Sequence, residues 1–136
     1  MHHTTLTIPT PGRGLVDITS NVRDAVAALG ARSGLCHLFV RHTSASLLIQ
    51  ENADPSVLRD LEVWMSALVR DGDPRFTHTE EGPDDMSAHV RGALTATQLS
   101  VPILDGELAL GVWQGLYLWE HRTRGRAREV VCSVLT

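Results

Sequence analysis

The spacing of apolar side chains changes several times along this chain of 136 residues, and each change predicts a new element. Short runs that alternate or are continuously apolar indicate strands, and we expect them at 6–8, 15–18, 35–42, 46–50, 99–104, 107–112 with its continuation 115–120, and 129–135. Apolar positions that recur every three or four residues indicate helices, and we expect these at 22–29, 55–68 and 86–95. The run at 35–42 is apolar on both faces, which is typical of a central strand.

Residues that start helices stand where the helical patterns begin. Asp54 and Pro55 combine a capping carboxylate with a proline at the first helical position, which is a strong start signal. Gly30 is expected to end the first helix. Asp105 and Gly106 predict a two-residue hairpin. The expected caps of the other two helices are Thr19 or Ser20 and Asp84 or Asp85.

The order of these elements predicts the fold class. Two strands, a helix, two strands, two helices and three strands indicate an α+β protein with a largely antiparallel sheet and about three helices. The length predicts a single domain, 1–136, with a core of its own. The polar segment 75–85 is long for so small a domain, and long loops of this kind often carry function.

Composition excludes several classes of function. The chain is 43% hydrophobic and 21% charged, as in ordinary globular domains, and its net charge of -4 argues against a dedicated nucleic-acid binder. All 12 basic residues are arginine, so lysine Schiff-base chemistry is excluded. No signal peptide or apolar run of membrane-spanning length is visible, which predicts a cytoplasmic protein without a membrane partner. Cys36 and Cys132 lie in apolar runs and are expected to be buried free thiols, whereas His2 and His3 are either native or a cloning remnant.

Three histidines on three expected elements suggest a metal site. His42 ends a strand, His78 lies in the long loop and His89 lies on the third helix. Three neutral imidazoles can bind a transition metal, zinc above all, and leave one position open for water or substrate. The alternative is that these are ordinary polar residues, because their spacing matches no established metal motif. The hydroxyls of Thr43, Ser44 and Ser46 lie beside the first histidine.

Carboxylates and arginines extend the candidate site. Asp84 and Asp85 lie between two of the histidines and can orient them, whereas Glu80 and Glu81 fit a solvated loop. Arg122 follows Glu120 at a strand end and can hold phosphate through forked hydrogen bonds. Two further groups have open alternatives. The pair Glu51 and Asn52 fits either a polar pocket beside Asp54 or a solvated corner, and Arg124 and Arg126 fit a turn tip.

Several of these stretches together resemble the YjbQ-like family, whose members are described as secondary thiamine-phosphate synthases. The matching stretches are HTSASLLIQENADPSVLRDLE, H-x5-DDM-x-x-H, LGVWQGLYL and EHR, and the resemblance runs from Leu6 to Leu135. It implies an α+β domain that assembles as a homotrimer around packed sheets. It also implies a histidine-rich pocket for metal or anion and a weak thiamine-phosphate synthase activity.

The resemblance also assigns roles to single residues. His42, His78 and His89 match the family's three histidines and are the expected metal ligands. The expected catalytic residues are Glu51, Asp54, Asp85 and Glu120. The expected substrate-binding residues are Thr43, Ser44, Ser46, Asn52, Trp113, Gln114 and Arg122. Two positions depart from the family pattern, with Val112 where threonine is usual and Gln50 where asparagine is frequent.

The implied reaction joins a pyrimidine methyl diphosphate to a thiazole phosphate and releases pyrophosphate. Such a leaving group usually calls for Mg²⁺ on oxygen ligands, whereas three imidazoles suit zinc, so both metals stay open. A metal-dependent hydrolase of a small phosphate ester or amide is one alternative. A non-catalytic trimeric protein that binds a small anion is the other. In each case the expected partner is a small phosphorylated molecule.

Overall fold

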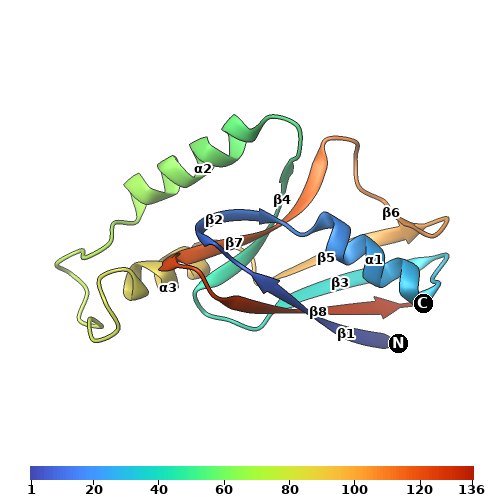
Figure 1. Cartoon of the computed structure of the whole chain (residues 1–136), viewed down its shortest axis with the longest axis horizontal. Helices are drawn as coiled ribbons and strands as arrows, with labels where there is room; N and C mark the ends of the chain where they lie inside the picture. Colours follow the sequence, from blue (N-terminus) through green and yellow to red (C-terminus); the bar gives the residue numbers. More distant parts are fainter.

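The computed structural model describes residues 1–136 and contains eight strands and three helices (Figure 1). The helices are α1 (Thr19–Leu29), α2 (Pro55–Leu68) and α3 (Asp85–Leu94). The strands are β1 (His2–Pro9), β2 (Gly12–Asp17), β3 (Gly34–Val40), β4 (Ala45–Glu51), β5 (Gln98–Leu104), β6 (Glu107–Leu108), β7 (Gln114–Arg124) and β8 (Ala127–Leu135).

The strands form two sheets in which every neighbouring pair is antiparallel. Five strands form one sheet in the order β1-β8-β3-β5-β6, and three form the other in the order β2-β7-β4. The chain passes directly between the sheets at the β1–β2, β3–β4, β6–β7 and β7–β8 connections, and through helices after β2 and after β4. The β1–β2 and β7–β8 connections lie side by side. Gly125 lies in the β7–β8 connection, where an added Cβ would come within 2.1 Å of the Thr10 carbonyl oxygen, so glycine is required. Three helices beside two antiparallel sheets confirm the predicted α+β class.

The main core lies between the two sheets and under α1. Alternate residues of β3, β7 and β8 point into it, and Val22 and Val26 of α1 close it. Figure 1 shows α1 lying along the strands of the larger sheet. The other face of the three-stranded sheet is covered by α2 and α3, where Met65 and Val69 pack on Trp119. Because both faces of β7 are covered, residues 115–121 are all buried. Polar side chains in this strand must therefore find partners inside the protein.

The expected strand 107–120 is wrong, because the chain leaves one sheet and enters the other within it. β6 ends at Leu108 beside β5, and β7 begins at Gln114 between β4 and β2. A short turn makes the crossing, and in it the Gln114 side chain accepts a hydrogen bond of 2.7 Å from the Gly111 amide. Apolar periodicity continues through both strands, so it does not reveal which sheet each one joins.

The expected cap residues are confirmed at α2 and α3 and corrected at α1. Asp54 caps α2 by accepting a 2.9 Å hydrogen bond from the Ser56 amide. At α1 the carboxylate of Asp17 accepts from the Thr19 amide, so the cap comes from an earlier residue than expected. Asp84 occupies the cap position of α3, but its side chain bonds elsewhere. Cys36 and Cys132 are buried free thiols, as expected.

One large face of the molecule is left without a covering layer. No helix packs on the outer side of the five-stranded sheet, where Phe39 of β3 is 45% exposed and Leu104 of β5 is 60% exposed. None of the three helices combines the length and apolar character needed to cross a membrane.

Candidate metal site at the start of helix α3

Two histidines and an aspartate meet where α3 begins. Asp85 is the first residue of this helix and His89 follows one turn later, so both side chains lie on one face. His78 reaches them from the loop between α2 and α3. The three ligand atoms lie within 4.8 Å of one another. The Nε2 atoms of His78 and His89 lie 2.8 and 3.2 Å from the same Oδ2 atom of Asp85.

The backbone determines which nitrogen of His89 carries its proton. Nδ1 lies 3.2 Å from the carbonyl oxygen of Thr43, which can only accept a hydrogen bond. Nδ1 therefore carries the hydrogen, and Nε2 of the neutral ring presents a lone pair toward a carboxylate oxygen of Asp85. Two lone pairs facing each other at 3.2 Å call for a cation between them, either a proton or a metal ion.

Asp85 is held in its ionised form. Its side chain is only 3% exposed. Burial by itself would raise the pKa of Asp85, but the hydrogen bond from His78, the contact with His89 and the charge of Arg122 outweigh it and hold the pKa below its ordinary value. The positive end of the α3 dipole acts in the same direction. A negatively charged ligand between two imidazoles is thus present across the neutral range.

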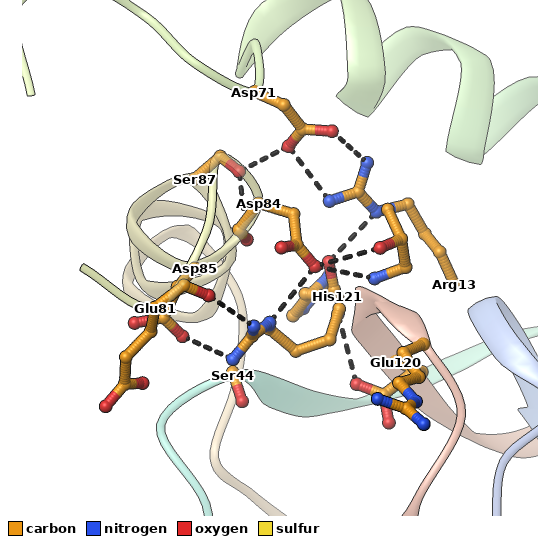
Figure 2. Close-up of polar contacts among 12 residues, drawn as sticks. Arg13, Ser44, Asp71, Glu81, Asp84, Asp85, Ser87, Glu120 and His121 are labelled. Atoms are coloured by element: carbon orange, nitrogen blue, oxygen red, sulfur yellow. Dashed lines mark hydrogen bonds and ion pairs between the residues drawn. The ribbon is translucent and has the colours of Figure 1, made fainter. Parts of the chain in front are cut away.

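Arg122 is occupied by carboxylates and does not offer a free guanidinium to a phosphate. Its donors reach Oδ2 of Asp84 at 3.1 Å, Oδ1 of Asp85 at 2.7 Å and the Glu81 carbonyl at 3.0 Å. Figure 2 shows these three acceptors gathered at the start of α3. Arg122 therefore orients the ligand Asp85 and holds α3 against β7, whereas the sequence predicts that it binds substrate.

Loss of this clamp should be visible as a loss of stability. Arg122→Ala leaves two largely buried carboxylates without their cation, and we expect the free energy of unfolding to fall by about 2 kcal/mol. Arg124→Ala removes an exposed arginine two residues along the same strand, and we expect a change within about 0.5 kcal/mol. Urea denaturation measures both. Weakened phosphate binding in Arg122→Ala at unchanged stability would instead favour the anion-binding role.

His42 does not join the other two histidines, which corrects the expectation of a three-imidazole site. Its Nε2 accepts a 2.8 Å hydrogen bond from the Glu129 amide, and its Nδ1 lies 3.3 Å from Nη1 of Arg128. Burial, followed by the nearby charge of Arg128, lowers the pKa of His42. His42 and His89 line one hollow of about 270 Å³, but the group that could hold a metal ion consists of His78, Asp85 and His89.

The hydroxyl residues after His42 serve the fold. Ser44 accepts from Nη2 of Arg128 through both its carbonyl and its side chain. Ser46 is fully buried, with its Oγ 2.8 Å from Nε2 of His121. Thr43 contributes the carbonyl oxygen that holds His89. The structure therefore does not present the two serine side chains to a substrate.

Glu120 is a buried partner of Arg128. It is 0% exposed, pairs with Nε and Nη2 of the guanidinium, and accepts a 2.8 Å hydrogen bond from Thr10. Burial by itself would raise the pKa of Glu120, but its hydrogen bonds with Arg128 and Thr10 lower it further than burial raises it. A carboxylate with these contacts stabilises the fold, whereas the family resemblance assigns it to catalysis.

The remaining predicted residues gather at the opposite end of β4. A strand of seven residues separates them from the histidines by about 20 Å, because the rise is about 3.3 Å per residue. Asn52 and Gln114 fold the turn before β7, and Trp113 projects from it. Gln50 lines the hollow beside this turn, so one of the two departures from the family pattern lies here. The members of this second cluster are Glu51, Asn52, Asp54, Trp113 and Gln114.

Buried polar residues behind the metal site are not among the expected ones. Arg91 of α3 is 1% exposed and donates to Glu62 and to the Val69 carbonyl. His121 is also buried. Burial is the main cause that lowers its pKa to about 3, so the ring is neutral. Arg128 has a sequence signal, since it lies in phase with the inward-facing positions of the last strand.

The chain is similar over nearly its whole length to known proteins. The profile of the family described as "UPF0047 protein YjbQ-like" matches residues 4–136. The UPF0047 protein sll1880 of Synechocystis is 50% identical over 133 residues, which cover 98% of this chain and 90% of that relative. The YjbQ protein of Salmonella typhimurium is 37% identical over 131 residues, covering 96% and 94%.

Solved structures agree with these sequence matches. The protein TT1486 of Thermus thermophilus has a TM-score of 0.86 at 39% identity, covering 97% of this chain and 99% of that one. APE1520 of Aeropyrum pernix has a TM-score of 0.90 at 26% identity, covering 99% and 98%. With the sequence profile and relatives of this similarity in agreement, the chain belongs to the UPF0047 YjbQ-like family.

Proposed function

We propose that this protein is a metal-dependent enzyme that uses His78, Asp85 and His89 as its ligand set. The supporting observation is that the Nε2 atoms of two imidazoles converge on one ionised carboxylate oxygen, with the tautomer of His89 set by Thr43. Tetrahedral ligands at about 2.0–2.2 Å from a zinc ion lie about 3.3 Å apart. The two separations between Asp85 and the imidazoles, 2.8 and 3.2 Å, are close to this value. The residues present therefore fit a divalent transition metal.

The ligand types favour zinc over magnesium. Two nitrogens and one oxygen suit zinc and its neighbours, whereas Mg²⁺ prefers a shell of oxygen atoms. When bound, such an ion supplies Lewis-acid polarisation of a substrate oxygen. The protein's own residues keep Asp85 ionised, orient it through Arg122, and leave His78 and His89 partly exposed on the open side.

We propose as substrate a small phosphorylated molecule, and as reaction the one that the family resemblance implies. A carbon–nitrogen bond forms between a pyrimidine methyl diphosphate and a thiazole phosphate, the carbon–oxygen bond to the diphosphate breaks, and thiamine phosphate and pyrophosphate are released. Family membership supports this proposal, together with a ligand set suited to a metal that polarises phosphate oxygens. We propose it as a weak or secondary activity.

Hydrolysis of a small phosphate ester or amide is the second candidate. The observation that favours it is the ligand set itself, since two histidines and one carboxylate with an open position form the zinc site of several hydrolases. In addition, the arginine beside the site is paired with two carboxylates, so no free guanidinium is available there to balance a departing pyrophosphate.

One experiment separates these functions. Zinc-loaded protein is incubated with the two synthase substrates, and with a panel of phosphate esters and amides, and products are followed by mass spectrometry. We expect thiamine phosphate with the wild type and none with Asp85→Asn, which changes a ligand atom while keeping its shape. Phosphate release from the panel alone would favour the hydrolase. Binding of these phosphorylated compounds without any turnover would exclude both enzymes and favour a non-catalytic anion-binding protein.

We propose that the protein assembles as a homotrimer through the outer face of the five-stranded sheet. This face lacks a covering helix and exposes Phe39 and Leu104, and the family resemblance supplies the number of subunits. Light scattering at micromolar concentration tests the proposal, and a stable monomer would contradict it.

We also propose a reducing compartment such as the cytoplasm, because Cys36 and Cys132 are free thiols with sulfur atoms 3.7 Å apart.

A further inference from the structure

We propose that Trp113, Glu51 and Asp54 form a second binding site, which takes a small organic cation with a flat or alkylated head. This site lies at the end of β4 remote from the histidines. It does not rest on the proposed metal chemistry. Its ligand class follows from an exposed aromatic ring, a hollow beside that ring and two carboxylates that form no ion pair within the chain.

The indole of Trp113 is exposed on a turn that cannot easily collapse. It is 63% exposed, yet the turn that carries it is held by Asn52, whose Nδ2 donates to the carbonyls of Val112 and Gln114 at 3.2 and 3.3 Å. The Asn52 amide also donates to the Trp113 carbonyl at 3.0 Å. A large aromatic surface held in water by so many contacts is preorganised for a ligand.

A hollow of about 440 Å³ lies against this ring. Trp113 and Gln114 form one side of it, and the end of β4 with the residues before α2 forms the other. Its lining residues are Ile49, Gln50, Glu51, Ala53, Asp54, Trp113 and Gln114. A smaller hollow of about 230 Å³ shares Glu51 and Asp54, so both carboxylates can be approached from two sides.

The charge at this hollow is negative, although Arg59 lies close enough to Asp54 to help lower its pKa. Neither Glu51 nor Asp54 forms an ion pair with any arginine of the chain. Hydrogen bonds from Ser56 lower the pKa of Asp54, so this carboxylate is ionised at neutral pH. Glu51 uses one oxygen to accept from the Asp54 amide at 3.2 Å. One further oxygen of each carboxylate remains without a hydrogen-bond partner in the protein.

An aromatic face beside two carboxylates selects for cations that are weakly hydrated. A quaternary ammonium or a heteroaromatic cation gains from the ring quadrupole of Trp113 and from the negative field of the carboxylates. A metal ion gains nothing from the indole, and a phosphate would be repelled. Small size follows from the volume of the hollow.

Benzyltrimethylammonium is a suitable probe, titrated into the full chain in the presence of EDTA. Indole N–H resonances report on Trp64, Trp113 and Trp119 separately. We expect a saturable shift of the Trp113 resonance alone. Affinity should fall about tenfold in Trp113→Leu and in Glu51→Gln, because each removes one of the two attractive contributions. Trp64→Leu is the matched control, since Trp64 is 61% exposed but lies on α2 outside this hollow. The affinity of the Trp64→Leu variant for the probe should equal that of the wild type.

Three outcomes would overturn the proposal. Equal affinity for benzyl alcohol would show that charge plays no part. Equal affinity in Trp113→Leu would place the probe elsewhere. A Trp113 resonance that never responds, because a second copy of the chain covers the ring, would make the surface an interface between subunits. Since EDTA removes any metal, each outcome is independent of the chemistry proposed for His78, Asp85 and His89.

Discussion

His78→Ala and His89→Ala should each lower the affinity for zinc by about 100-fold or more. Each variant removes one of three protein ligands and leaves a carboxylate with a single imidazole, and even outer contacts of metal ligands are worth about 10- to 100-fold. The measurement is a zinc titration of metal-free protein against a competing chelator. Both side chains are partly exposed, so the fold should survive, and circular dichroism checks this.

His42→Ala makes the experiment decisive. If three imidazoles formed the site, this variant would lose zinc as the other two do. The structure instead gives His42 a backbone partner at Glu129, so zinc affinity should stay within about threefold of the wild type while some stability is lost. His37→Ala is the second control, because His37 is bound to Gln98 on β5 and is not part of the ligand set. A large loss of zinc affinity in His42→Ala would instead support the hypothesis of a three-histidine site.

The same titration should depend on pH in a known direction. Protons compete with the metal for Nε2 of His78 and His89, so zinc affinity should fall as the pH is lowered. The pKa of Asp85 is held below its ordinary value, so this carboxylate keeps its charge across the neutral range and does not add to the effect there. Affinity that is insensitive to pH would mean that the imidazoles are not ligands.

Glu120→Ala should lower the free energy of unfolding by about 3–5 kcal/mol. The variant leaves Arg128 buried with no negative partner, and an uncompensated buried charge is costly to hold away from water. Arg41→Ala is the control, because it breaks a pair in which both side chains are about half exposed, and such pairs contribute about 0–1 kcal/mol. Chemical denaturation measures both values. An active-site role for Glu120 would instead appear as lost activity at unchanged stability.

Acid should remove the stabilisation that the ionised Glu120 side chain contributes to the folded protein. The pKa of Glu120 is lower in the folded protein than in the unfolded chain, where it is about 4.3. The unfolded state therefore binds the proton more tightly, and the stabilisation is present above about pH 4.3 and is lost as the pH falls through the lower, folded value. Glu120→Gln should unfold with a weaker dependence on pH in this acidic range than the wild type.

Local signals in the sequence were sufficient for most elements and for part of the site. Asp54 and Pro55 start α2 and Gly30 ends α1, because capping depends on atoms only a few residues apart. For the same reason, the one-turn spacing of Asp85 and His89 on a helix already places two proposed ligands on one face. His78, the third proposed ligand, lies only seven residues before Asp85 in the sequence, so a short turn of the loop is enough to bring it beside them.

Roles that depend on contacts between distant residues were decided by the tertiary structure. Arg122 and Arg128 both lie in a basic stretch that resembles a turn tip, yet one orients Asp85 and the other is buried against Glu120. His42 is assigned by partners 86 and 87 residues away. The sequence determines which side chains are polar and on which face of their element they lie. Which polar groups meet depends on how the two sheets stack, because each buried charge takes the partner that packing places beside it.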